Sequence, residues 1–180
     1  KEAKDRILAK KTKTGGLLIV HTGKGKGKTT AAMGMVMRCI GHGMKVGIVQ
    51  FVKGAWETGE RDVLDTFPDQ VEIAVMGEGF TWETQDRSRD IAAANKAWER
   101  SKEMIASGEY GFVLLDEINI VLRYDYIDIN EVVEFMSNKP SSVHVACTGR
   151  NAKPALIEAA DLVTEMTEIK HHFRADFKAQ

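Results

Sequence analysis

The 180-residue chain has only two cysteines and three prolines. None of its apolar stretches approaches the ~18 residues of a membrane span. The cysteines, Cys39 and Cys147, lie far apart in apolar segments and match no metal-ligand spacing, so we expect buried free thiols. Residues 1–14 lack the apolar core of a secretory signal, and a net charge of −1 gives no sign of a nucleic-acid surface. The sequence therefore favours a cytoplasmic protein with no membrane or nucleic-acid partner.

The remaining composition is that of an ordinary globular protein, with 43% hydrophobic and 28% charged residues. Its length predicts one domain with one sizeable core. Six basic residues stand against Glu2 and Asp5 in residues 1–13. We therefore divide the chain into a basic N-terminal arm, residues 1–15, and a domain, residues 16–180. The arm is either a frayed, solvated terminus or a segment that closes over a polyphosphate.

The motif T-G-K-G-K-G-K-T-T, residues 22–30, lies between an apolar run at 17–20 and a helical pattern at 31–40. This order is that of a phosphate-binding loop (P-loop). Glycines let backbone amides turn toward phosphate oxygens, and the next helix adds partial positive charge at its first turn. Lys28 supplies a full charge, and the Thr29 hydroxyl is placed to bind Mg²⁺. The predicted phosphate-binding residues are Thr22, Gly23, Lys24, Gly25, Lys26, Gly27, Lys28, Thr29 and Thr30.

This loop departs from the common pattern at one position. Thr22 stands where the first glycine is usual, so the loop is tighter by one residue if Gly23 takes that role. The alternative is a surface turn rich in glycine and lysine, which the flanking strand and helix disfavour.

A second motif, L-L-D-E, closes a continuous apolar run at residues 111–117. Such a run predicts a strand covered on both faces, with its carboxylates at the edge where the phosphate loop also lies. Asp116 suits a magnesium shell. Glu117 has three open roles: it binds metal, orients a substrate or acts as a base.

Three further features have both a structural and a functional interpretation. Arg150 follows the strand pattern at 142–147 and either faces the same crevice or lies on a surface turn. Phe80 and Trp82 have a spacing that puts both rings on one side of an extended segment, where they either plug the loop onto the core or meet a ligand. The adjacent pair His171-His172 is interpreted as surface residues.

The order of patterns predicts an α/β fold in a single domain, with a mostly parallel sheet and helices on both faces. Residues 53–62 are expected to form a loop, 124–128 a connector, and Asp128 with Glu131 a capping box. Asn151 is expected to cap a short helix that runs to about residue 159. The predicted strands are 17–20, 46–52, 71–75, 111–117, 142–147 and 161–165, and the other predicted helices are 29–42, 85–107 and one that starts at 129 and stops before Pro140.

Eight motifs together resemble those of one family, over nearly the whole chain from about Gly16 onward. They are T-G-K-G-K-G-K-T-T at 22–30, V-Q-F-V-K-G at 49–54, G-E-R at 59–61, G-F-T-W-E-T at 79–84, L-L-D-E at 114–117, Y-D-Y at 124–126, T-G-R at 148–150 and K-H-H-F at 170–173. The chain resembles the P-loop corrinoid adenosyltransferases, which convert cob(I)alamin and ATP to adenosylcobalamin and triphosphate. The resemblance implies a RecA-like P-loop core, ATP in the loop, a homodimer and a reductase or flavoprotein that supplies electrons.

The resemblance also implies roles for individual residues. Reduced cobalt attacks C5′ of ATP and the whole triphosphate leaves, so Lys28, the loop amides and Arg150 would stabilise its charge. The expected catalytic residues are Lys28, Glu117 and Arg150, and the expected Mg²⁺ ligands are Thr29, Asp116 and Glu117. Phe80 and Trp82 would contact the corrinoid, keeping the lower axial face of cobalt free of a ligand. The basic arm would cover the active site of a neighbouring subunit.

Two other functions stay open from the sequence. A RecA-like P-loop kinase or phosphohydrolase would release ADP or phosphate rather than intact triphosphate. A regulatory module would bind nucleotide without turnover.

Overall fold

Six strands form one sheet within the part of the chain that the computed structural model describes, residues 11–52, 59–75 and 86–171. The strands are β1 (Leu18–Thr22), β2 (Val46–Gln50), β3 (Val71–Val75), β4 (Phe112–Asp116), β5 (His144–Thr148) and β6 (Leu162–Glu165). The helices are α2 (Lys28–Gly41), α3 (Gly59–Leu64), α4 (Arg87–Ala106), α5 (Ile118–Arg123), α6 (Ile129–Ser137) and α7 (Pro154–Ala159).

All the strand pairs in this sheet are parallel, and their order is β3-β2-β4-β5-β1-β6. The predicted α/β class and parallel sheet are therefore confirmed. β1 lies between β5 and β6, with Val20 opposite Cys147 on one side and Val163 on the other. Because the strands are parallel, the phosphate loop after β1, the D-E pair of β4 and the T-G-R turn after β5 meet at one edge.

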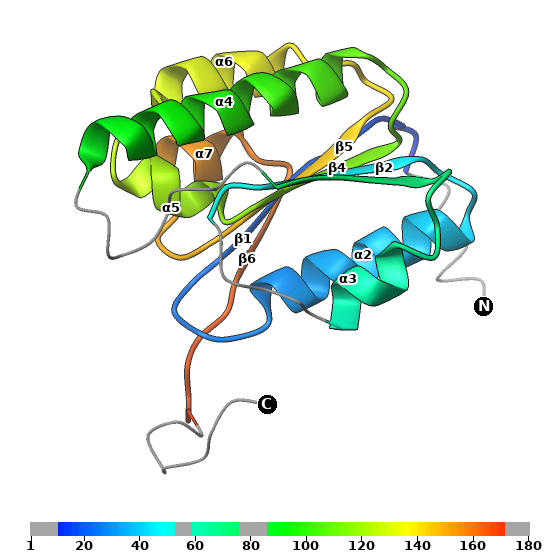
Figure 1. Ribbon diagram of the computed structural model, residues 1–180, viewed down its shortest axis with the longest axis horizontal. Helices are drawn as coiled ribbons and strands as arrows, with labels where there is room; N and C mark the ends of the chain where they lie inside the picture. The colour runs from blue at the N-terminus through cyan, green and yellow to red at the C-terminus, as the bar shows by residue number, and fades with distance from the viewer. Residues whose placement is uncertain (1–10, 53–58, 76–85, 172–180) are drawn as a thin grey trace.

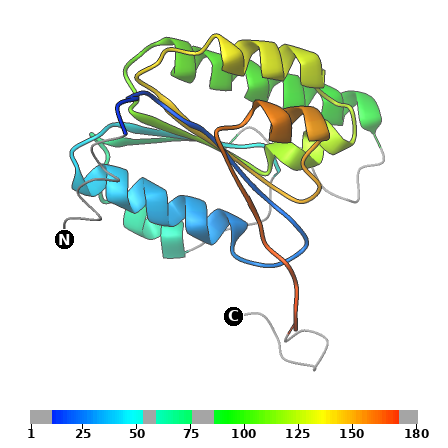
Figure 2. The same ribbon diagram turned by 180° about the vertical axis from the view of Figure 1, so that it is seen from behind.

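Helices cover both faces of the sheet, so the molecule has three layers (Figures 1 and 2). α2 and α3 lie on one face and α4, α5, α6 and α7 on the other. Each interface has its own apolar core: Val36 and Ile48 belong to the core beneath α2, and Trp98 and Leu115 to the core beneath α4. Strands buried on both faces explain the continuous apolar runs in the sequence.

Helices α4 and α6, which lie on the same face of the sheet, each begin after an aspartate that caps the helix. Asp86 accepts hydrogen bonds from the backbone N–H groups of Ser88 and Arg89 at the start of α4. Asp128 caps α6 as predicted, accepting from the Asn130 N–H. The reciprocal half of the predicted capping box does not form, because Glu131 instead accepts a 2.7 Å hydrogen bond from the indole N–H of Trp98.

Two short helices were not predicted. Residues 53–62 were expected to be a loop, yet α3 begins at Gly59, and Leu64 is its buried residue. One buried side chain gives no helical periodicity to detect. α5 directly follows β4, and its apolar residues merge with the strand pattern.

The predicted cap at Asn151 was wrong. Asn151 has φ 56°, and α7 instead begins after Lys153, with Pro154 in its first turn.

Other expectations concern the cysteines, the termini and membrane spans. Both cysteines are free thiols as expected, but only Cys147 is fully buried, whereas Cys39 is half-buried. Within the described ranges, no helix combines the length and apolarity needed to cross a bilayer. Of the arm, residues 11–15 are exposed and irregular, and the rest lies outside the described residues.

Two glycine-to-alanine substitutions test this packing in opposite directions. Gly34 is exposed within α2, and a Cβ there would meet no atom within 4 Å. We expect Gly34→Ala to stabilise the protein by about 0.5–1 kcal/mol, because alanine favours helix.

A Cβ on Gly16 would lie 2.0 Å from the Val143 carbonyl oxygen. We expect Gly16→Ala to destabilise by about 1–3 kcal/mol. Urea denaturation measures the free energy of unfolding of both variants. A Gly16→Ala variant as stable as wild type would contradict the close approach of the Gly16 and Val143 backbones.

Candidate active site

The phosphate loop follows β1 and is fixed by the chain that leaves β6. Gly25 donates its N–H to the Met166 carbonyl oxygen at 2.7 Å, and a Cβ on Gly23 would lie 2.4 Å from that oxygen. Gly27 precedes α2 with φ 105°, a conformation that favours glycine. No side chain caps α2, so its first backbone N–H groups can serve an anion.

Thr22, the residue in place of the usual first glycine, has a structural role. It is 6% exposed, and its hydroxyl oxygen accepts a 2.9 Å hydrogen bond from the Ala152 N–H. This bond joins the end of β1 to the segment after β5. A glycine at this position would lack it.

Lys28 is a buried cation at the start of α2. Its residue is 7% exposed, and its Nζ donates to the Gly25 carbonyl oxygen at 2.6 Å. Burial lowers the pKa of this ammonium, Arg150 and Lys26 act in the same direction, and Glu117 opposes them. A bound anion would favour the charged form, so the site is suited to polyphosphate.

Asp116, at the end of β4, joins two other segments of the site. Its Oδ1 accepts hydrogen bonds from the hydroxyls of Thr29, at 2.9 Å, and Thr148, at 2.7 Å. Burial raises the pKa of this carboxyl, and the two hydrogen bonds oppose that shift. The contact brings together α2, β4 and β5, as parallel strand ends predict.

Glu117 lies next to Asp116 in a left-handed conformation, with φ 62°. Its N–H donates to the Thr148 hydroxyl oxygen at 2.9 Å. Its Oε2 is buried and has no hydrogen-bond partner among the described residues. Burial raises the pKa of this carboxyl, the charge of Asp116 adds to the shift, and Lys28 and Arg150 oppose it. A buried carboxylate oxygen without a partner is suited to a metal or a ligand donor.

Arg150 is exposed and follows a turn held by α5. Asn119, which is fully buried, donates its side-chain N–H to the Gly149 carbonyl oxygen at 3.0 Å. Gly149 has φ 125°, and a Cβ there would lie 2.9 Å from the Asn119 Cβ. The turn thus brings Arg150 to the phosphate loop rather than to a distant surface.

Two pockets adjoin at this edge of the sheet. The main pocket, of about 550 Å³, is lined by Gly25, Lys26, Gly27, Lys28, Thr29, Thr30, Glu60, Glu117, Ile120, Arg123, Tyr124 and Arg150. The neighbouring pocket, of about 830 Å³, includes the other predicted loop residues, Thr22, Gly23 and Lys24. Arg123 and Arg150 line both pockets. The predicted phosphate contacts are therefore divided between two adjoining spaces.

Sequence reasoning gave Arg123, Tyr124 and Asn119 no role in the site. Arg123 ends the unpredicted helix α5 and Tyr124 follows it, so the Y-D-Y motif alone did not place them beside the loop. Asn119 gave no signal, because a single buried asparagine has no characteristic spacing. Phe80 and Trp82 lie outside the described residues.

The residues present fit Mg²⁺ bound together with phosphate. Within the described ranges, no group of three or more acidic, histidine or cysteine side chains could hold a metal alone. Mg²⁺ usually takes one or two carboxylates and completes its shell with substrate phosphates and water. Asp116, Glu117 and the Thr29 hydroxyl supply such a partial set.

Comparison with known proteins identifies relatives over the full length. A family model described as "ATP:corrinoid adenosyltransferase BtuR/CobO/CobP" matches residues 14–180. A corrinoid adenosyltransferase of Sinorhizobium sp is 59% identical over 182 residues, covering 100% of this chain and 85% of that protein. The corrinoid adenosyltransferase of Escherichia coli K12 is 46% identical over 180 residues, covering 100% of this chain and 91% of that protein.

A solved structure agrees at the level of fold. The flagellar accessory protein FlaH from Methanocaldococcus jannaschii has a TM-score of 0.57 over 92% of this chain and 76% of its own, at 10% identity. At so low an identity, the likeness shows a shared fold and says nothing about activity.

The substitution Glu117→Gln tests the electrostatics of the site without ligand. Burial raises the pKa of Glu117, so the folded state binds its proton more tightly than the unfolded chain does. The charged carboxylate therefore destabilises the protein above its folded pKa. We expect Glu117→Gln to raise Tm at pH 7.5, by about 2–4 °C for each kcal/mol, and the gain to shrink as pH falls through that pKa.

Differential scanning calorimetry measures this gain between about pH 5 and 8, the range in which most proteins are most stable. Glu60→Gln is the matched control, because Glu60 lines the same pocket but is exposed. Equal melting curves for wild type and Glu117→Gln at every pH would contradict the burial of this charge.

Proposed function

We propose how the site works from one premise: this chain belongs to the ATP:corrinoid adenosyltransferase family. It is a transferase that moves the 5′-deoxyadenosyl group of ATP to the cobalt of a reduced corrinoid and releases triphosphate. The electron pair of cobalt(I) forms the cobalt–C5′ bond. The C5′–O5′ bond breaks, and its electron pair leaves with the triphosphate. Since no water is activated, the enzyme has to stabilise the negative charge that develops on the leaving triphosphate, and it needs no general base.

Lys28 and the loop amides hold the departing triphosphate. The observation that carries this proposal is the buried Lys28 ammonium in a pocket of about 550 Å³ whose lining also includes Arg123 and Arg150. Charge that develops on O5′ in the transition state meets cations already in place. Preorganised donors in a site shielded from water stabilise such charge most effectively.

Asp116, Glu117 and the Thr29 hydroxyl would hold Mg²⁺ in this site. Glu117 supports this role through its buried, unpartnered Oε2 in the described structure, and Asp116 already accepts the Thr29 hydroxyl. When bound, Mg²⁺ supplies charge neutralisation to the phosphates. We therefore assign Glu117 as a metal ligand and not as a general base.

Phe80 and Trp82 are proposed to contact the lower axial face of the corrinoid. Aromatic rings exclude water and offer cobalt no lone pair, so a four-coordinate corrinoid is favoured and its reduction becomes easier. The proposal rests on the G-F-T-W motif at residues 79–82. His171 and His172 are not needed as cobalt ligands.

The assembly around the site is proposed from the same family relation. A homodimer in the cytoplasm would place the basic arm, residues 1–15, over the neighbouring active site, and a reductase or flavoprotein would supply the electron. Six basic residues in 1–13 support a contact with polyphosphate.

The products of a single anaerobic reaction test this function. The purified protein is mixed with chemically reduced cob(I)alamin, ATP and Mg²⁺, the visible spectrum is followed, and the phosphates are separated by anion exchange. We expect one equivalent of intact triphosphate for each adenosylated cobalamin. ADP or orthophosphate with unalkylated cobalt would favour a P-loop kinase or phosphohydrolase instead.

Lys28→Ala tests the hold on the leaving group. We expect kcat with cob(I)alamin to fall by about 10²–10³-fold or more, because a buried cation no longer stabilises the triphosphate. Lys96→Ala is the matched control, since Lys96 is exposed on α4 and lines neither pocket. A near-normal rate for Lys28→Ala would remove this lysine from the mechanism.

Trp82→Ala tests the proposed corrinoid contact. We expect a larger loss of rate when the reaction starts from cob(II)alamin and a reductant than when it starts from cob(I)alamin, because the ring assists reduction rather than alkyl transfer. Trp56→Ala is the control, since the resemblance assigns Trp56 no role. Equal losses from both starting states would indicate that the Trp82 ring only packs.

A further inference from the structure

Asn119, the second residue of α5, is a fully buried polar side chain to which the proposed chemistry gives no role. Its side-chain NH₂ group donates to two backbone carbonyl oxygens, that of Gly149 at 3.0 Å and that of His21 at 3.5 Å. Its Oδ1 is buried and has no hydrogen-bond partner among the described residues. A buried acceptor without a partner lowers the stability of a fold, so stability alone does not account for an asparagine here.

The two carbonyl groups belong to the segments that carry the two cations of the main pocket. Gly149 directly precedes Arg150. His21 lies near the end of β1, and its ring Nδ1 donates to the Lys28 carbonyl oxygen at 3.2 Å. Lys28 and Arg150 line the same pocket. One amide group therefore joins the turn that carries Arg150 to the strand that leads to Lys28.

The turn before Arg150 is shaped by its contact with Asn119. A Cβ on Gly149 would lie 2.9 Å from the Asn119 Cβ and 3.2 Å from the Glu117 Oε2, so the backbone approaches α5 more closely than a side chain would allow. Arg150 itself is exposed. Its place in the pocket is therefore set by the backbone of the turn rather than by packing of its own side chain.

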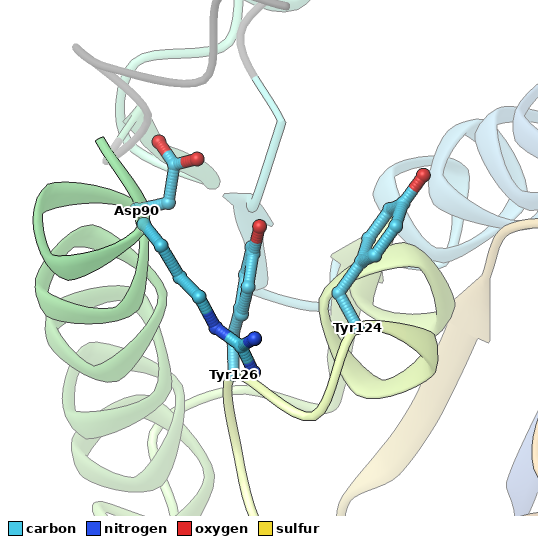
Figure 3. Close-up of a pocket in the computed structure, with 4 residues that line it drawn as sticks. Asp90, Tyr124 and Tyr126 are labelled. Carbon is cyan, nitrogen blue, oxygen red and sulfur yellow. The ribbon is translucent and has the colours of Figure 1, made fainter. Parts of the chain in front are cut away.

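The helix that carries Asn119 is held at both ends. At its start, the N–H of Glu117 donates to the Thr148 hydroxyl oxygen at 2.9 Å. At its end, the Tyr124 ring stacks on the Tyr126 ring, with 5.7 Å between centroids and 25° between planes. Figure 3 shows Tyr124 beside α5 and Tyr126 on the chain that follows it. Asn119 is thus a fixed support against which the turn is held.

We infer that Asn119 is a positioning residue that holds the Arg150 turn against the end of β1, so that Arg150 and Lys28 act on one triphosphate. This inference rests on the proposed function, because the leaving triphosphate is the ligand that the two cations share. Asn119 is fully buried and acts only through the Gly149 and His21 carbonyl groups. A misplacement of about 1 Å in such a site is enough to lower a rate on the order of 10²-fold.

A double-mutant cycle tests this role by isothermal titration calorimetry of inorganic triphosphate with Mg²⁺. The proteins are wild type, Asn119→Ala, Arg150→Ala and the double variant. Asn119→Ala keeps the Cβ against which Gly149 packs and removes only the amide. We expect it to raise the Kd about 10-fold, the scale of one hydrogen bond between a cation and phosphate. The double variant should bind within about 2-fold of Arg150→Ala, because residues that act through one another are not additive.

A matched control and a kinetic measurement complete the cycle. Asn138 is an exposed asparagine whose side-chain N–H donates to the Glu134 carbonyl oxygen at 2.9 Å, and it lines neither pocket, so Asn138→Ala should bind as wild type does. The kcat with cob(I)alamin should follow the same pattern as triphosphate binding, and KM for the corrinoid should stay unchanged. If Asn119→Ala fails to fold, Asn119→Ser, which keeps one donor, takes its place.

Three results would overturn the inference. The first is wild-type triphosphate affinity in Asn119→Ala, and the second is wild-type affinity in Arg150→Ala. The third is a double variant in which the two separate losses multiply, because a residue with only a structural role weakens binding by its own factor in either background. Wild type that binds triphosphate in the expected cycle but transfers no adenosyl group would count against the proposed function instead.

Discussion

The burial of opposite charges at one edge of the sheet is the constraint on which the site depends. Asp116 and Lys28 are each 7% exposed, and burial shifts the pKa of each toward its neutral form. Neither shift is the mark of a structural ion pair, because a paired group would be held in its charged form. The folded protein therefore keeps a cation and two carboxylates, including Glu117, in an environment that disfavours their charges. Under the proposed function, a polyphosphate with Mg²⁺ would reverse this, since it would offer Lys28 an anion and the carboxylates a cation.

Parallel topology makes this arrangement possible. β1 lies between β5 and the edge strand β6, and its helix α2 lies on the face opposite α5 and α7. The loops from the strand ends therefore open away from one another and leave space between them. Hydrogen bonds across the strand ends keep that space defined: Thr148 links Asp116 to the backbone of Glu117, and Thr22 links β1 to the segment after β5. These hydrogen bonds are made by the threonine hydroxyls at the ends of β1 and β5.

Much of this could be predicted from the sequence, because it depends on local patterns. The strand at 71–75 matches its predicted bounds, and Lys28 and Asp116 were expected at one edge since parallel strands bring their ends together. What was missed depends on backbone conformations that sequence does not reveal. Glu117 is a non-glycine residue with positive φ, and the turn it makes starts α5 and brings Arg123 beside the loop. The hydroxyl of Thr22 likewise has a partner 130 residues away.

The most direct measurement of the central claim is the binding of inorganic triphosphate to the unliganded protein by isothermal titration calorimetry, with Mg²⁺ present. If the buried charges are arranged for the leaving group, triphosphate without adenosine should bind and should raise Tm, and pyrophosphate should bind more weakly. Triphosphate that fails to bind while ATP binds normally would contradict the account, because the affinity would then come from the nucleoside and not from the buried charges.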